Sequence, residues 1–123
     1  MSVPALILSP ETRVSLDAGF AAAFGGTPER YFSAPGRTEI GGNHTDHQRG
    51  RVLAAAVNLD TVAAVRLNGT NTIRILSKGY PMCEVDLENL LPVVAEVNST
   101  PALIRGVAAR FTQMVFTVNG FDA

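Results

Sequence analysis

Residues 34–50 read APGRTEIGGNHTDHQRG and contain both histidines of the chain, His44 and His47, with Asp46 between them. Glycine and asparagine are frequent in this stretch, as they are in turns and loops. A histidine and an aspartate in a glycine-flanked loop can bind a metal, hold a sugar, or lie in an ordinary solvated turn. A metal site, a sugar site and a solvated turn each require different residues elsewhere in the sequence.

A metal site requires more ligands than this sequence offers. Zinc sites use three or four protein donors, each supported by neighbouring groups. The chain has only two histidines, and no further ligand set follows them in the sequence. We therefore expect no metal at this stretch.

A sugar site fits the spacing of the polar residues better. His44 and Asp46 are separated by one residue, so in an extended loop they project to the same side, where an imidazole and a carboxylate can bind neighbouring hydroxyls. Arg37 adds a positive charge, and hydroxyl-binding groups beside a cation suit phosphoryl transfer to a hydroxyl. From spacing alone, an ordinary turn in which Arg37 and Asp46 pair on the surface remains an open alternative.

The composition indicates one globular domain without a charged interaction face. The chain has 123 residues, 46% hydrophobic and 17% charged, with a formal net charge of -1. That charge provides no basic field for nucleic acid or anionic lipid, so neither is expected as a partner. The apolar run at residues 1–7 lacks a basic flank and is too short to span a membrane, and the single cysteine fits a reducing compartment. We expect a cytoplasmic location.

Two helices are predicted from capping residues and apolar spacing. Ser9-Pro10 favours a helix start, and a helix is expected to run from there to Gly25-Gly26. Thr100-Pro101 repeats the signal, and this second helix is expected to end near Asn119-Gly120. The apolar residues expected to face the core are Leu16, Phe20 and Phe24 in the first helix and Ile104, Val107, Phe111 and Met114 in the second.

The strands between the helices are expected to form a mostly antiparallel sheet. Short strands are predicted at residues 31–34, ending at Pro35, and at residues 61–67. Asn68-Gly69 indicates a hairpin turn that leads to a returning strand at residues 73–77, and residues 82–87 alternate as a third strand of a meander. The fold class is therefore α+β, with helices covering one face of the sheet.

Residues 34–50 closely resemble the galactokinase signature, usually written A-P-G-R-V-N-L-I-G-E-H-T-D-Y-x-x-G. The resemblance extends to residues 52–58, 85–87 and 104–107 and covers essentially the whole chain. Galactokinases belong to the GHMP kinase superfamily, whose N-terminal domain resembles domain 2 of ribosomal protein S5. The resemblance implies that residues 1–123 form a truncated N-terminal sugar-binding region of this kind. The signature positions that match are Ala34 to Arg37, Gly42, His44 to Asp46, and Gly50.

The resemblance also assigns roles to individual residues. It implies that Arg37 stabilises the transition state near the anomeric hydroxyl and that His44 and Asp46 hydrogen-bond galactose. Asn43 occupies the place of a sugar-binding glutamate, and a neutral amide accepts a weaker hydrogen bond than a carboxylate. A related sugar is therefore an alternative substrate. His47 replaces the usual tyrosine and Glu39 the usual asparagine, and neither change removes the other sugar-binding residues.

Galactokinases use ATP and Mg2+, and the resemblance implies both cofactors for the full-length enzyme. The serine-rich loop that cradles the phosphates and the aspartate that serves as base do not occur in these 123 residues. We therefore expect that neither cofactor binds strongly to this fragment and that it is inactive alone. The alternative function is a non-catalytic galactose-sensing regulator. Because a truncated sheet exposes an edge, self-association through that edge is also expected.

Overall fold

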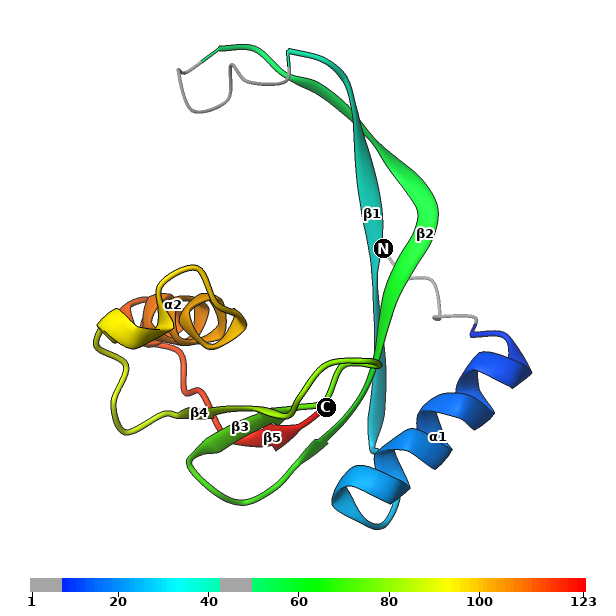
Figure 1. The fold of residues 1–123 in the computed structure, drawn as a ribbon, viewed down its shortest axis with the longest axis vertical. Helices are drawn as coiled ribbons and strands as arrows, with labels where there is room; N and C mark the ends of the chain where they lie inside the picture. Colours follow the sequence, from blue (N-terminus) through cyan, green and yellow to red (C-terminus); the bar gives the residue numbers. More distant parts are fainter. Residues whose placement is uncertain (1–7, 43–49) are drawn as a thin grey trace. The chain divides into compact units, whose positions relative to one another are not determined.

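A computed structural model describes residues 8–42 and 50–123. The chain contacts group these residues into two compact units, one within residues 31–63 and one formed by residues 8–30 and 64–123. No helix of the described part of the chain is long and apolar enough to cross a membrane. Figure 1 labels the helices α1 (Pro10–Phe24) and α2 (Thr100–Gln113) and the strands β1 (Arg30–Gly41), β2 (Leu53–Leu67), β3 (Thr72–Ile75), β4 (Cys83–Asp86) and β5 (Phe121–Asp122). A 3-10 turn, η2 (Val94–Glu96), precedes α2.

Helix α1 begins and ends where the sequence predicts. The Ser9 hydroxyl accepts a hydrogen bond from the Thr12 N–H at 3.1 Å, which satisfies one of the donors that a helix start leaves open. Gly25 terminates the helix with a φ of 71°, a backbone angle that glycine adopts without steric cost. Phe20 is buried, and its ring centroid lies 5.1 Å from that of Phe24. The predicted helix is confirmed, but of its predicted core residues Phe20 is buried, whereas Leu16 and Phe24 are partly exposed.

Strands β1 and β2 are both longer than predicted. β1 continues through Pro35 to Gly41, and β2 begins at Leu53. Proline lacks an N–H, but β1 is an edge strand of the sheet, where a missing donor is tolerated. A Cβ at Gly36 would lie 3.0 Å from the Leu59 carbonyl oxygen, so glycine permits the close approach of the two strands. The predicted end of the strand at Pro35 was therefore wrong.

The sheet is not the predicted meander, because β5 is inserted between β2 and β3. The strand order is β1-β2-β5-β3-β4. β5 is antiparallel to β2, with Arg66 opposite Asp122, and parallel to β3, with Arg74 opposite the same residue. Only the antiparallel pair of β3 and β4 follows the prediction. The predicted hairpin at Asn68-Gly69 was thus wrong, although both flanking strands exist.

Close packing around Gly120 explains why residues 68–72 do not form a tight hairpin. The Gly120 N–H donates to the Thr70 carbonyl at 3.0 Å, and the Asn68 N–H donates to the Gly120 carbonyl at 3.3 Å. A Cβ at position 120 would overlap the Thr70 carbonyl oxygen. Residues 68–72 therefore bend around the segment that leads into β5. This segment separates β2 from β3.

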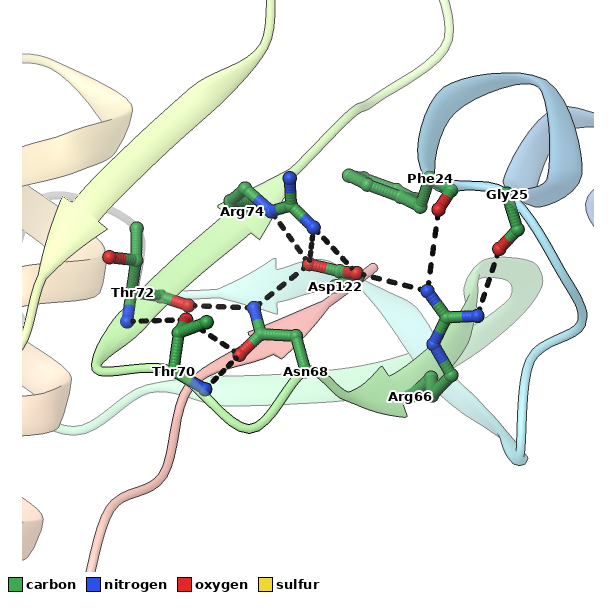
Figure 2. Close-up of polar contacts among 8 residues, drawn as sticks. All are labelled: Phe24, Gly25, Arg66, Asn68, Thr70, Thr72, Arg74 and Asp122. Carbon is green, nitrogen blue, oxygen red and sulfur yellow. Dashed lines mark hydrogen bonds and ion pairs between the residues drawn. The ribbon is translucent and has the colours of Figure 1, made fainter.

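A fully buried carboxylate lies where β2, β3 and β5 meet (Figure 2). Arg74 donates to both oxygens of Asp122 at 2.8 Å, Asn68 donates at 2.9 Å and Arg66 at 3.3 Å. Burial by itself disfavours the charged form of this carboxyl, but the hydrogen bonds from Asn68 and Arg74, the charge of Arg74 and the hydrogen bond from Arg66 outweigh it. Together they hold the pKa of Asp122 below its ordinary value.

The same arginines connect α1 to the sheet. Arg66 donates to the carbonyls of Gly25 at 2.8 Å and Phe24 at 3.4 Å, which places a cation at the C-terminal end of the helix (Figure 2). Its guanidinium lies 5.0 Å from the centre of the Phe20 ring, and that of Arg74 lies 5.3 Å from the Phe24 ring. We refer to Asp122, Arg66, Arg74 and Asn68 as the Asp122 cluster.

Helix α2 packs through a buried arginine rather than through its predicted apolar stripe. Its cap is Ser99, one residue before the predicted Thr100. Arg105 is 7% exposed and donates to both carboxylate oxygens of Glu96, at 2.9 and 2.7 Å, and to the carbonyls of Asp86 and Asn89. The hydrogen bonds from Arg105 to Glu96, together with the charge of the arginine, hold the pKa of Glu96 below its ordinary value.

The predicted stripe and the predicted end of α2 were both partly wrong. Val107, Phe111 and Met114 are 50%, 48% and 50% exposed, whereas Ala108 is buried. The helix ends at Gln113, because Val115 adopts a φ of 67° and the chain turns back. The Phe116 ring then lies edge-on to that of Phe111, with centroids 5.8 Å apart.

We predict that Asp122→Asn lowers the free energy of unfolding by about 2 kcal/mol, because the two arginines lose their charged acceptor in a buried site. Chemical denaturation at pH 7 measures the loss. The exposed acid Glu84 of β4 provides the control, and Glu84→Gln is expected to change stability by less than about 0.5 kcal/mol.

The pH dependence of the same variant tests the role of the charge. A carboxyl whose folded pKa is depressed contributes stability above its unfolded pKa of about 4, and this stability is lost as pH falls through the folded value. The difference between wild type and Asp122→Asn should therefore shrink below about pH 4. A difference that stays constant down to about pH 2 would show that charge is not what the cluster requires.

Candidate functional site

The polar stretch singled out from the sequence lies where β1 ends and the chain crosses to β2. Arg37 is on β1 itself, not on a loop as the short predicted strand implied. Residues 42–52 connect β1 to β2, and the predicted sugar-binding residues Asn43, His44 and Asp46 belong to this connection. They and His47 lie outside the described residues, so their predicted roles stay predictions.

Arg37 presents an accessible cation next to this connection. Its side chain is 73% exposed and lies 3.5 Å from the carboxylate of Glu39, two residues along the same strand face. An exposed ion pair at this distance contributes little free energy and does not hold the guanidinium in place. Arg37 can therefore turn towards a ligand. The alternative in which Arg37 pairs with Asp46 stays a prediction, because Asp46 lies outside the described residues.

Glycine at position 42 brings the two ends of the connection together. Gly42 has a φ of 84°, which residues with a Cβ rarely adopt. A Cβ here would overlap the carbonyl oxygen of Arg51 and approach the Val52 Cα to 3.1 Å. Residues 43–50 therefore join two points that are adjacent in space. The glycine of the signature thus has a steric reason, independent of any ligand.

A polar contact between β1 and β2 stabilises the strand that carries Arg37. The Ser33 hydroxyl donates to the Asp60 carboxylate at 2.5 Å, joining β1 to β2 four residues before Arg37. Together with the close approach at Gly36, this contact fixes the strand that carries the arginine. Sequence reasoning did not single out Ser33 or Asp60, because neither residue alone indicates a partner 27 positions away.

A hollow that the sequence did not indicate lies beside the N-terminus of α2. It has a volume of about 490 Å³. Burial and the nearby Glu96 and Glu84 raise the pKa of the Cys83 thiol in its wall, so the thiol stays protonated at neutral pH. Among the described residues, no group of three or more His, Cys, Asp or Glu side chains could hold a metal ion. The lining residues are Ile75, Ser77, Tyr80, Pro81, Met82, Cys83, Asn98, Ser99, Thr100 and Pro101.

Comparisons with known proteins match the part of the chain that contains β1 and β2. Residues 18–67 match the family model "galactokinase galactose-binding signature". The galactokinase of Lacticaseibacillus casei (strain BL23) is 43% identical over 63 residues, which is 51% of this chain and 16% of that protein. The galactokinase of Lactococcus lactis subsp. cremoris (strain MG1363) is 35% identical over 75 residues, 58% of this chain and 19% of that protein.

A comparison of the fold with solved structures also finds a galactokinase. The crystal structure of Lactococcus lactis galactokinase complexed with galactose superposes with a TM-score of 0.75 and 27% sequence identity. The match covers 89% of this chain and 29% of that chain. This chain therefore spans less than a third of the relatives that it matches.

The fold is similar to that of an N-terminal domain of the GHMP kinase type. Within that class, the chain is related to the N-terminal portion of galactokinases. The predicted α+β class and the predicted family are both confirmed.

We predict that Gly42→Ala lowers the midpoint of thermal unfolding, because the added methyl group meets the Arg51 carbonyl at a strained φ, a cost of about 1–3 kcal/mol. Gly41→Ala is the matched control, since nothing lies within 4 Å of a Cβ there. Equal effects of the two substitutions would contradict the steric role assigned to Gly42.

Proposed function

We propose that this chain provides the sugar-binding region of a galactokinase-type kinase, which transfers the γ-phosphoryl group of ATP to O1 of galactose. The observation that carries the proposal is the signature at residues 34–50, which lies inside the matched region and includes Arg37, an exposed arginine on β1. The related Lactococcus lactis enzyme was crystallised with galactose. Phosphoryl transfer from ATP and the single cysteine favour a cytoplasmic location.

The sugar-binding residues would act through position and charge. His44 and Asp46 would hydrogen-bond hydroxyls of the sugar and orient its anomeric oxygen. Arg37, exposed on β1, would stabilise the negative charge that develops near that oxygen during transfer. Glu39 lies 3.5 Å from Arg37 and offsets part of the positive charge of its guanidinium.

Asn43, in place of the glutamate of the signature, favours a sugar other than galactose as the substrate of the kinase. An amide retains an acceptor oxygen but accepts a weaker hydrogen bond than the glutamate of the signature. A sugar with a different substituent at the contacted carbon would lose less from this change than galactose does. A kinase of a related sugar is therefore the alternative that the sequence favours.

In the full-length kinase that we propose, ATP would supply the phosphoryl group and Mg2+ would neutralise charge on the phosphates. The described residues contain no cluster of acidic and histidine side chains for a metal ion, and the 123 residues contain no serine-rich phosphate loop. We therefore assign no step of the transfer to a cofactor bound by this chain.

We predict that galactose binds to the 123-residue chain and that His44→Ala or Asp46→Ala weakens binding about 10- to 100-fold, the cost of one or two lost hydrogen bonds. Ligand-observed NMR with galactose, glucose and N-acetylgalactosamine measures affinity and preference. His47→Tyr, which restores the residue of the signature, is the control and should bind as wild type. Loss of binding in His47→Tyr alone would contradict the assigned roles.

We also predict that the purified chain releases no ADP above background when supplied with ATP, Mg2+ and galactose. The physical reason is that nothing in its sequence cradles the phosphates. A coupled ADP assay measures the rate, with a full-length galactokinase as positive control. Galactose-dependent ADP release by the chain would overturn this prediction without affecting the galactose-binding prediction.

A further inference from the structure

The ion pair of Arg37 and Glu39 differs in geometry from the structural ion pairs of this chain. Arg105 donates to both oxygens of Glu96, at 2.9 and 2.7 Å, as in the strong bidentate pairs of an arginine with a carboxylate. Arg37 instead makes a single contact with Glu39, at 3.5 Å. Such a contact uses little of the hydrogen-bonding capacity of either group. Both groups can therefore bind a further polar molecule without giving up a strong bond to each other.

The two side chains lie on the same face of β1, because residues two positions apart on a strand point the same way. The side chain of Glu39 is 28% exposed, against 73% for Arg37. A partly covered carboxylate has fewer orientations than a fully exposed one, so it loses less conformational freedom when it binds a ligand. The strand itself is held against β2 by the hydrogen bond from Ser33 to Asp60. An acceptor and a cation are thus presented side by side on a fixed strand.

The sequence exchanges an acid and an amide relative to the signature. The signature has asparagine at the position of Glu39 and glutamate at the position of Asn43, whereas this chain has the reverse. The number of carboxylates at the written positions of the signature is therefore unchanged, and only their place differs. Glu39 belongs to β1, before Gly42 turns the chain with a φ of 84°. In this chain the acid therefore lies on the strand, next to Arg37.

We propose that Glu39 binds the sugar substrate and accepts a hydrogen bond from its hydroxyl at C2. The inference rests on the proposed function, in which Arg37 lies near the anomeric oxygen. A carboxylate 3.5 Å from that guanidinium lies within reach of the groups next to the anomeric carbon. An ionised carboxylate only accepts hydrogen bonds. Of the two neighbours of the anomeric carbon, the ring oxygen has no proton to donate, whereas the C2 hydroxyl has one. Glu39 therefore selects sugars with a free hydroxyl at C2.

The test compares galactose with 2-deoxygalactose, which lacks only this hydroxyl. Ligand-observed NMR measures the affinity of each sugar for the wild-type chain and for Glu39→Gln, which keeps the shape of the side chain and removes its charge. Glu84→Gln is the matched control, since Glu84 is an exposed acid on the other edge strand, β4. The unfolding midpoint of each variant is recorded and should stay that of wild type, because an exposed ion pair contributes little stability.

We expect Glu39→Gln to bind galactose about tenfold or more weakly than wild type, the effect of losing a hydrogen bond to a charged acceptor. The same substitution should leave the affinity for 2-deoxygalactose unchanged, because that sugar has no C2 hydroxyl to donate. Glu84→Gln should bind both sugars as wild type does. An equal loss for both sugars would show that Glu39 acts only through Arg37 and would overturn the proposed contact, as would the absence of any loss.

The outcomes separate this inference from the proposed function. Galactose binding that Glu39→Gln leaves intact would refute the role of Glu39 alone, whereas a wild-type chain that binds no sugar would refute both. A double variant, Glu39→Asn with Asn43→Glu, returns both positions to the signature. It should regain the galactose affinity that Glu39→Asn alone loses, and failure to regain it would contradict the exchange of roles between the two positions.

Discussion

The buried carboxylate of Asp122 is the interaction on which the larger unit depends. It accepts hydrogen bonds from residues at the end of β2, in the turn that follows and in β3, while it belongs to β5 itself. Arg66 also donates hydrogen bonds to the carbonyls at the end of α1, which links the helix to the carboxylate. A single ionised group therefore holds together three strands and a helix that are distant in sequence. A buried charge is tolerated here because both carboxylate oxygens accept hydrogen bonds and two of the donors are cations.

This constraint explains why local sequence reasoning predicted the elements better than their order. The capping residue Ser9, the terminating Gly25 and the alternation that buries Val85 are local signals, and the structure follows them. The insertion of β5 between β2 and β3 is not local, since it depends on an aspartate that meets two arginines 48 and 56 residues earlier. A turn signal at Asn68-Gly69 favours a hairpin, but the asparagine side chain is used to bind Asp122 and the loop instead.

The candidate site shows a similar division. Arg37 could be identified from the signature, but its position on a strand depends on tertiary contacts at Gly36 and Ser33 with β2, which no spacing along the chain reveals. Conversely, the glycine of the signature at position 42 is explained by steric contact with residues 51 and 52 across the connection. A motif of this kind therefore combines residues that bind with residues that only shape the backbone, and structure separates the two.

Helix α2 reverses the usual relation between apolar pattern and burial. Its spacing predicts a core-facing stripe, yet the buried positions are an arginine and an alanine, and the stripe is half exposed. Helix propensity does not distinguish these orientations, but the bidentate pair of Arg105 with Glu96 does, because rotation would leave a charge unpaired. The apolar pattern is that of a packing surface, and the described residues leave it uncovered.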